Sequence, residues 1–218
     1  MQILLDSAII EEARQSAEWG WVSGVTTNPV LLAKSDLSPE KTLRKLKKLF
    51  KGPIFYQLFG HTLNAMKEEA EKAADILGKQ LVLKIPATEL GFRATARLSK
   101  KYTCAVTSIF SPAQAMVAHT AGAHFALYYH NRAKRLLENG EDLASELVRV
   151  LKNTNTHVVA ASLKTPEEVV EARSAGVLIL STNFEVLTQM MKHDLSEAAL
   201  DEFNQSGTGL LNTKEDHS

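Results

Sequence analysis

Lys84 is the residue in this chain whose surroundings most favour chemistry. It lies in the apolar run Leu81–Pro86, which is typical of a buried strand. Burial without a partner disfavours the charged form of an amine. A neutral amine can attack a carbonyl carbon and form a Schiff base. A lysine in such a run can also pack its stem while its amino group reaches water, so the run alone leaves both interpretations open.

Polar residues follow most of the other apolar runs as well. Seven of the eight expected strands end in a side chain that can form hydrogen bonds or act as a nucleophile. These residues are Asp6, Thr26 to Asn28, Gln57, Lys84, Thr107, Tyr129 with Arg132 just beyond it, and Ser162. Each has an ordinary structural explanation by itself, so the inference depends on their convergence at one edge of a sheet.

The residue types define what such a site could do. Asp6 could transfer a proton to or from a substrate hydroxyl, or cap the following helix. Asn28 could orient a hydroxyl group or serve as a turn residue, and Gln57 is an amide that needs partners if buried. Thr107 could belong to the site, but threonine is also frequent in ordinary strands. Tyr129 is either an acid/base phenol or a core aromatic.

Arg132 and Ser162 follow neighbouring strands and together resemble an anion site. A guanidinium group can contact a phosphate through two parallel hydrogen bonds, and a hydroxyl can add a third. Without that context an arginine is usually a surface charge. The seven histidines show no spacing typical of a metal site, and Cys104 is expected to be a packed thiol.

Short β-rich runs alternate with helical segments along the whole chain. The expected strands are Gln2–Asp6, Val22–Thr26, Ile54–Phe59, Leu81–Ile85, Thr103–Ile109, His124–Tyr129, His157–Ala161 and Val177–Leu180. The expected helices are Ile9–Trp19, Pro39–Phe50, His61–Leu77, Gly91–Lys100, Pro112–Ala121, Glu141–Lys152, Thr165–Ser174 and Phe184–Lys192, with an extra C-terminal helix at Ser196–Phe203.

Eight such units predict an α/β fold of the (β/α)8 TIM-barrel type. An open doubly wound sheet is the main alternative, but the turn after the first strand lacks the glycines typical of that fold. No linker divides the chain, so we expect one domain over residues 1–204 with the C-terminal helix, and a flexible tail over 205–218. Active sites of such barrels lie at the carboxyl ends of the strands.

Composition excludes several classes of function. Lys+Arg and Asp+Glu both number 25 among 218 residues, so nothing in the charge balance indicates nucleic acid or a membrane surface. No run approaches the length of a membrane helix, and no secretory signal is recognisable. The single cysteine is typical of a reducing, cytoplasmic setting.

Several segments resemble the transaldolase / fructose-6-phosphate aldolase family. Within that family, the chain is most similar to the short fructose-6-phosphate aldolase subgroup. The matching segments are Leu4–Asp6 (LLD), Gly24–Pro29 (GVTTNP), Leu83–Pro86 (LKIP), Tyr129–Arg132 (YHNR) and Ala160–Pro166 (AASLKTP). The resemblance covers about residues 1–204. It implies a (β/α)8 barrel, a sugar-phosphate or hydroxyketone substrate, no metal, no organic cofactor, and a homodecamer built from two pentamers.

The resemblance also assigns roles. Lys84 is the expected Schiff-base residue and Asp6 the proton-transfer carboxylate. Gln57, Thr107 and Tyr129 are expected to hold a catalytic water, with Tyr129 active in proton transfer. The expected substrate-binding residues are Asn28, Thr26, Arg132 and Ser162.

Two positions divide the family. Transaldolases typically carry Glu and Phe where this chain has Gln57 and Tyr129, so we favour reversible cleavage of fructose 6-phosphate to dihydroxyacetone and glyceraldehyde 3-phosphate. The alternatives are a transaldolase that transfers the dihydroxyacetone unit, and a non-catalytic sugar-phosphate-binding barrel. Departures from the family pattern are Ser7 in place of Thr, a more basic loop at Ala133–Leu137, and Ser181–Asn183 in place of an apolar, proline-containing turn.

Overall fold

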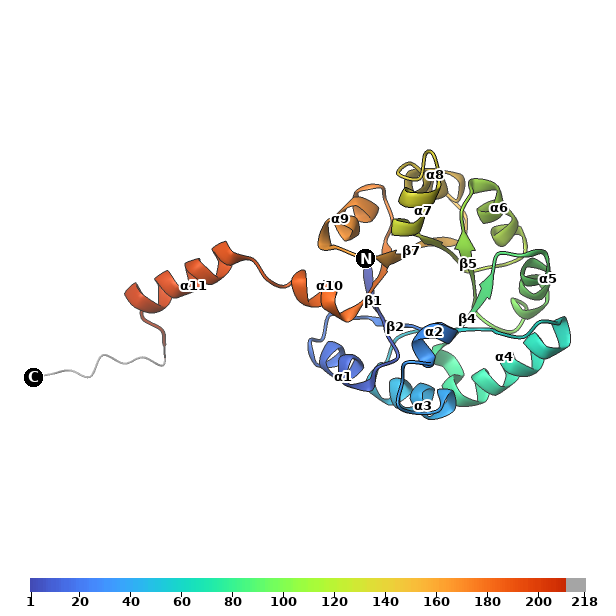
Figure 1. Ribbon diagram of the computed structural model, residues 1–218, viewed down its shortest axis with the longest axis horizontal. Coiled ribbons are helices and arrows are strands. Elements are labelled where there is room, and N and C mark those ends of the chain that lie inside the picture. Colours follow the sequence, from blue (N-terminus) through green and yellow to red (C-terminus); the bar gives the residue numbers. More distant parts are fainter. Residues whose placement is uncertain (211–218) are drawn as a thin grey trace, which may run out of the picture.

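Eight parallel strands form a closed barrel in the order of the sequence, in a computed structural model that describes residues 1–210 (Figure 1). The strands are β1 (Gln2–Asp6), β2 (Gly24–Thr26), β3 (Ile54–Gln57), β4 (Leu81–Pro86), β5 (Cys104–Ile109), β6 (Phe125–Tyr129), β7 (His157–Leu163) and β8 (Ile179–Thr182). The first and last strands pair, and Leu4 lies opposite Ser181. The predicted (β/α)8 architecture is therefore confirmed.

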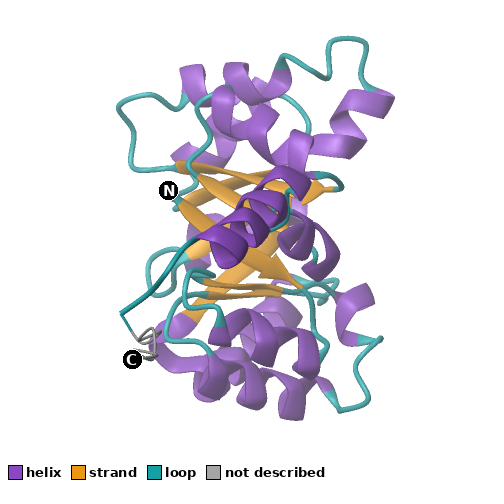
Figure 2. Cartoon of the chain, turned by 90° about the vertical axis from the view of Figure 1, so that its left-hand side faces the viewer, coloured by secondary structure: helices purple, strands orange, loops and turns teal. Residues whose placement is uncertain are grey.

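Helices follow the strands, and most of them lie around the outside of the barrel (Figures 1 and 2). They are α1 (Ile10–Glu18), α2 (Pro29–Leu32), α3 (Pro39–Leu49), α4 (Leu63–Leu77), α5 (Glu89–Leu98), α6 (Pro112–Thr120), α7 (His130–Leu136), α8 (Leu143–Val150), α9 (Pro166–Ser174), α10 (Phe184–Gln189) and α11 (Asp194–Ser206), with a 3-10 turn at Gly78–Gln80. Within residues 1–210, every helix is too short or too polar to span a bilayer.

Capping residues fix where several of these helices begin. The side chains of Ser38, Ser111 and Thr165 each accept a hydrogen bond from a backbone N–H in the first turn, with proline at the next position. Such a cap satisfies a helical N–H that has no partner inside the helix. Proline costs nothing there because its missing N–H would have had no helical acceptor.

The apolar side chains form two layers. One layer lies between the barrel and its helices and contains residues such as Leu5, Leu83 and Leu187. The other fills the barrel interior. Its members are Leu4, Phe55, Val82, Ala105, Leu127, Val159, Ala161 and Ile179. Because side chains alternate along a regular strand, the residue two positions beyond an interior residue also points inward. The exception is Leu163, which follows a register shift in β7 and packs in the outer layer.

The structure differs from the sequence-based boundaries at several places. The helices α2 and α7 were not predicted, since each is a single short segment directly after a strand. The last strand runs over Ile179–Thr182 rather than ending at Leu180, and β3 ends at Gln57 rather than Phe59. These shifts matter because they change which residues stand at the strand ends.

The helix α11 extends away from the barrel (Figure 1) and contains no buried residue. Of the expected tail, Gln205 and Ser206 belong to the last turn of α11, and residues 211–218 lie outside the described part of the chain. The single domain over residues 1–204 stays a prediction, supported by the continuous barrel.

Candidate active site

The polar strand ends form a layer directly above the apolar interior of the barrel. Six of these side chains lie two positions beyond a residue of the barrel interior: Asp6 beyond Leu4, Gln57 beyond Phe55, Lys84 beyond Val82, Thr107 beyond Ala105, Tyr129 beyond Leu127, and Ser181 beyond Ile179. The seventh, Thr26, ends β2 and contacts both Asp6 and Ser181. We call these seven residues the inner layer. Alternation along the strands thus brings together residues from seven of the eight strands.

Lys84 is buried in this layer, with 2% of its surface exposed. Its Nζ donates a hydrogen bond to the backbone carbonyl oxygen of Thr27 at 3.1 Å. Within the described residues it forms no ion pair. The amine of Lys84 is thus enclosed by protein, with a backbone carbonyl oxygen as its hydrogen-bond acceptor.

One hydroxyl group contacts Asp6, and a second hydroxyl group contacts the first. The Oγ1 of Thr26 donates to Asp6 Oδ1 at 2.6 Å, and the Oγ of Ser181 lies 2.6 Å from the same Thr26 oxygen. Both hydroxyl residues are fully buried. Sequence reasoning ended the last strand at Leu180, two residues too early, and so missed Ser181 as a site residue. Counting in twos from the apolar Ile179 would have found it.

Gln57, Thr107 and Tyr129 contribute an amide and two hydroxyl groups. The hydroxyl of Thr107 donates to the phenol oxygen of Tyr129 at 3.2 Å. The Oε1 of Gln57 is buried and has no hydrogen-bond partner among residues 1–210. A buried acceptor without a partner is uncommon and costs free energy, so this oxygen is positioned to accept from a water or a substrate hydroxyl.

Asn28 lies between β2 and α2 and is half-buried. Its side-chain oxygen accepts a hydrogen bond from Leu31 N at 2.9 Å and caps α2. The amide nitrogen forms no hydrogen bond within the described residues, so it remains free to donate to a ligand. The capping and ligand-binding interpretations of Asn28 are thus compatible.

Two strands that flank β6 end in irregular backbone. The register between β5 and β6 shifts between Val106 and Ile109, and Ser108 has φ of 62°. The register between β7 and β8 shifts between Ala160 and Leu163, and Ser162 has φ of 59°. Bulges re-aim side chains and are frequent beside active sites, and positive φ in a residue with a Cβ is strained.

Arg132 lies in α7, at the edge of the barrel mouth, and is exposed. Its guanidinium carbon lies 4.8 Å from the centre of the Tyr129 ring, which places a cation over the ring face. Arg132 and Ser162 form no hydrogen bond to each other in the described residues. We use the name α7 rim for Arg132, Lys134 and Arg135 of α7 together with Ser162 of β7.

Two acidic residues of α9 hold α7 in place. Glu168 accepts from the Asn131 side chain at 2.7 Å and from Lys164 N at 2.7 Å. Glu171 accepts from Lys134 Nζ at 2.6 Å. The contact with Lys134, followed by that with His130, lowers the pKa of the Glu171 carboxyl. The helix that carries Arg132 is therefore tied to the segment that follows Ser162.

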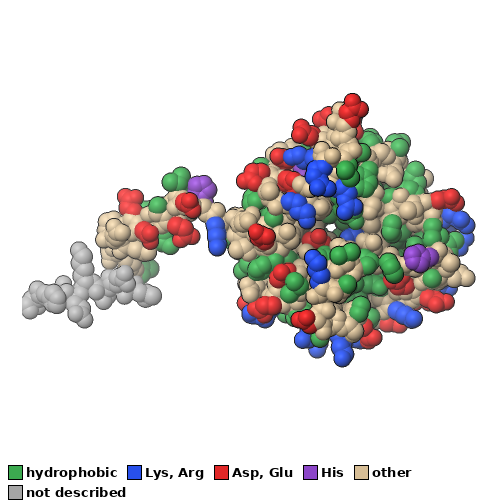
Figure 3. All heavy atoms as spheres, in the orientation of Figure 1, with side chains coloured by type: hydrophobic (Ala, Val, Ile, Leu, Met, Phe, Trp, Pro, Cys, Tyr) green, Lys and Arg blue, Asp and Glu red, His purple; other side chains and the backbone are tan. Residues whose placement is uncertain are grey.

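A buried ring pair completes this support. The His130 Nδ1 lies 3.0 Å from the Tyr128 hydroxyl, and its Nε2 lies 3.2 Å from Glu171 Oε2. Burial, followed by the charges of Glu168 and Glu171, raises the pKa of Tyr128, so its hydroxyl keeps its proton. The space-filling view shows Lys and Arg side chains beside the barrel opening, over the region that α7 occupies (Figure 3).

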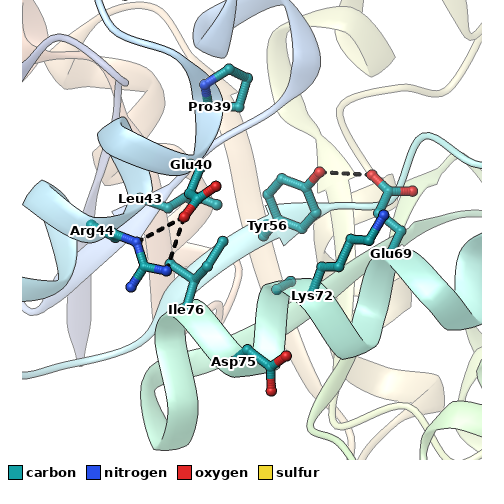
Figure 4. Close-up of a pocket in the computed structure, with 10 residues that line it drawn as sticks. Pro39, Glu40, Leu43, Arg44, Tyr56, Glu69, Lys72, Asp75 and Ile76 are labelled. Atoms are coloured by element: carbon teal, nitrogen blue, oxygen red, sulfur yellow. Dashed lines mark hydrogen bonds and ion pairs between the residues drawn. The ribbon is translucent and has the colours of Figure 1, made fainter.

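A cavity of about 350 Å³ lies outside the barrel, between α3 and α4 (Figure 4). Its wall includes Tyr56, whose hydroxyl donates to Glu69 at 2.7 Å, and burial raises the pKa of that phenol. Glu69 also accepts from the backbone N–H groups of Phe59 and Gly60, each at 2.9 Å, and so fixes the loop after Gln57. The cavity contains no residue of the inner layer, so we place the candidate site at the barrel mouth.

Two other kinds of chemistry find no support in the geometry. Burial raises the pKa of the Cys104 thiol to about 12, so the thiolate is not formed at neutral pH. Among residues 1–210, no three His, Cys, Asp or Glu side chains gather in a manner that could hold a metal ion.

The structure is thus a (β/α)8 barrel whose mouth carries a buried lysine and an aspartate in one layer of polar side chains. The family model for transaldolase / fructose-6-phosphate aldolase matches residues 3–217. The chain belongs to this family.

The names of similar proteins agree with this family assignment. The chain is 36% identical over 206 residues to a protein named "Probable transaldolase" from Symbiobacterium thermophilum, covering 93% of this chain and 95% of that one. It is 36% identical over 207 residues to a protein of the same name from Caldicellulosiruptor saccharolyticus, with the same coverage.

Solved structures support the fold alone. A mandelate oxidase matches with a TM-score of 0.60 and 13% sequence identity, covering 84% of this chain and 64% of the oxidase. The chain thus spans less than two thirds of that enzyme's length, and at this identity the likeness carries only the barrel architecture.

Proposed function

We propose that this protein is a class I aldolase that reversibly cleaves fructose 6-phosphate to dihydroxyacetone and glyceraldehyde 3-phosphate. The single observation that carries the proposal is the burial of Lys84 inside the barrel without an ion-pair partner. A neutral amine in that position can attack the ketone carbon of the sugar. Loss of water then gives an imine, which withdraws electrons from the adjacent carbon–carbon bond.

The inner layer supplies the proton transfers. In cleavage, Asp6 takes the proton of the substrate hydroxyl while the electrons of the breaking carbon–carbon bond move to the imine and form an enamine. A water held by Gln57, Thr107 and Tyr129 then protonates the carbon. The free Oε1 of Gln57 and the Thr107–Tyr129 hydrogen bond support this assignment.

The remaining residues bind substrate in this proposal. The free amide nitrogen of Asn28 orients the covalent intermediate, and Thr26 acts at the same end of the site through its contact with Asp6. Arg132 and Ser162 bind the phosphate, which the position of α7 beside β7 supports. An exposed guanidinium group at the mouth can contact a phosphate while the sugar chain reaches inward.

Chemical trapping tests the proposal directly. Borohydride added in the presence of fructose 6-phosphate or dihydroxyacetone should reduce the imine and leave a stable mass increase on Lys84, located by peptide mass spectrometry. The matched control is Lys84→Met, which keeps an apolar stem of similar length and should show no adduct. Absence of an adduct in the wild-type protein, or an adduct on another lysine, would remove the proposal.

A transaldolase is the second candidate, because the curated relatives bear that name. The imine is the same, but the dihydroxyacetone unit passes to an aldose phosphate. Gln57 favours the aldolase, since an amide cannot titrate and only orients water, whereas a glutamate can act as a base. Release of free dihydroxyacetone should exceed transfer to erythrose 4-phosphate, and dominant transfer would favour the transaldolase.

We also propose a cytoplasmic homodecamer of two pentamers. The apolar residues of α11, which include Leu195, Leu200 and Phe203, are exposed on a helix that leaves the barrel. Such a surface is typical of an interface. Light scattering of the full chain should give the decamer mass, and a change of Phe203 to Glu should reduce it. The lone, buried Cys104 supports the cytoplasmic location.

A further inference from the structure

A chain of two hydroxyl groups ends on the Asp6 carboxylate, and its far end is Ser181. The three residues stand at the ends of β8, β2 and β1, and β1 lies between the other two strands in the barrel. Ser181 Oγ lies 2.6 Å from Thr26 Oγ1, and Thr26 Oγ1 lies 2.6 Å from Asp6 Oδ1. Ser181 and Thr26 are both fully buried, so these contacts are shielded from bulk water.

The number of hydrogens that each group carries determines which group donates each hydrogen bond. An ionised carboxylate has no hydrogen to give, and a threonine hydroxyl has one. Since Thr26 donates its hydrogen to Asp6, Ser181 must donate to Thr26. Ser181 forms no other side-chain hydrogen bond in the described residues.

The reverse arrangement is less favourable. If Asp6 were protonated and donated to Thr26, then Thr26 would donate to Ser181. The hydrogen of Ser181 would then have no acceptor within the described residues, which is costly for a buried hydroxyl. In the order Ser181 to Thr26 to Asp6, by contrast, the hydrogen of each hydroxyl group has an acceptor.

We propose that Ser181 is a positioning residue for Asp6, an inference that rests on the proposed aldolase function. The two linked hydroxyl groups hold Oδ1 of Asp6, with Thr26 in direct contact with it. They leave Oδ2, which has no hydrogen bond in the described residues, for the substrate hydroxyl. Hydrogen bonds in a buried chain polarise one another, so the hydroxyl of Ser181 strengthens the bond that Thr26 makes to the carboxylate. Ser181 touches no reacting atom.

The experiment compares Ser181→Ala with the wild-type enzyme in fructose 6-phosphate cleavage. Loss of the donor should lower kcat roughly tenfold, as expected for one hydrogen bond that acts on a charged group. KM should stay within about twofold, and borohydride trapping on Lys84 should persist, because neither depends on Asp6 orientation. Ser181→Thr keeps the hydroxyl and should recover most of kcat.

Thr182 provides the matched control. It is the next residue on β8 and is equally buried, but its hydroxyl donates to the Leu163 carbonyl oxygen at 2.9 Å, on the outer side of the strand. Thr182→Val should lower the unfolding temperature without lowering kcat. If Thr182→Val lowers kcat as much as Ser181→Ala does, the effect is a general loss of structure and the role of Ser181 is overturned.

Two further outcomes separate a failure of this inference from a failure of the proposed aldolase function. Unchanged kcat in folded Ser181→Ala, with normal trapping in the wild-type protein, overturns the inference and leaves the aldolase proposal intact. Absence of trapping in the wild-type protein overturns the aldolase proposal itself. If Ser181→Thr is too large to fold, Ser181→Cys keeps a weak donor and should give a kcat above that of Ser181→Ala.

Discussion

The inner layer and the α7 rim are neighbouring parts of one barrel mouth, but they are built in different ways. The inner layer consists of side chains on strands, mostly buried, joined by hydroxyl, carbonyl and carboxylate contacts such as Lys84 to Thr27 and Thr26 to Asp6. The α7 rim carries Arg132 and Arg135 exposed on a short helix, and it is supported by surface ion pairs such as Lys134 to Glu171.

This difference separates two requirements of the proposed reaction. Covalent chemistry needs an amine and proton-transfer groups with their hydration removed and their orientations fixed. Phosphate capture needs positive charge that substrate can reach from solvent. Changes to the inner layer should therefore reduce kcat, whereas a change to Arg132 in the α7 rim should raise KM for phosphorylated substrates.

The largest effect is expected for Lys84→Met. Without the amine no imine can form, so kcat/KM should fall by on the order of a thousandfold or more, as for other removed nucleophiles. The fold should persist, because the substitution replaces a buried amine with an apolar group of similar shape. A coupled assay for glyceraldehyde 3-phosphate measures the loss. Residual activity above a tenth of wild type would show that the amine is not the nucleophile.

Tyr129→Phe tests the water-binding end of the inner layer. Removal of the hydroxyl that accepts from Thr107 should lower kcat by about a hundredfold, the usual contribution of a proton-transfer group. Tyr128→Phe is the matched control, since its hydroxyl points to His130 instead. The control should keep kcat within about twofold. Equal losses in both variants would contradict the assignment.

Arg132→Gln tests the α7 rim. Loss of the guanidinium group should raise KM for phosphorylated substrate by about ten- to a hundredfold, the worth of hydrogen bonds to a charged group. Cleavage of a ketose without phosphate should be unaffected. Arg135→Gln, an exposed change on the same helix, should alter KM less than threefold. A fall in kcat without a change in KM would place Arg132 with the inner layer instead.

The smallest effect is expected for Glu171→Gln. Contact with Lys134 lowers the pKa of Glu171 below its ordinary value of 4.5, so this ion pair stabilises the fold above that pH and is lost as the pH falls through the lowered value. Glu171 is 48% exposed, and solvent screening limits the difference in Tm at pH 7 to about 2 °C. Calorimetry should find the difference at pH 7 and none well below pH 4. A difference that persists in acid would exclude the ion pair as its cause.

Much of the inner layer could be predicted from the sequence because strands alternate. Once the apolar run around Lys84 is recognised as a strand, its residues alternate between the helices and the barrel interior. The same rule applies to Asp6, Gln57, Thr107 and Tyr129. Ser181 was missed only because the end of the last strand was placed two residues too early.

The α7 rim was harder to predict. The short helix α7 and the bulge at Ser162 depend on contacts with segments distant in sequence, such as Asn131 with Glu168 and His130 with Glu171. The residue types pointed to an anion site at Arg132 and Ser162. They carried no signal for the helix that sets its position.

By itself, the sequence determined the barrel, its eight units, the family, and which residues could do chemistry, because hydrophobic periodicity and strand-end residues are local properties of the chain. Only the tertiary structure decided which hydroxyl donates to which, that Lys84 has a carbonyl rather than a carboxylate as its partner, and where α7 lies. Those features arise when strands far apart in the sequence close into a ring, and no single segment encodes them.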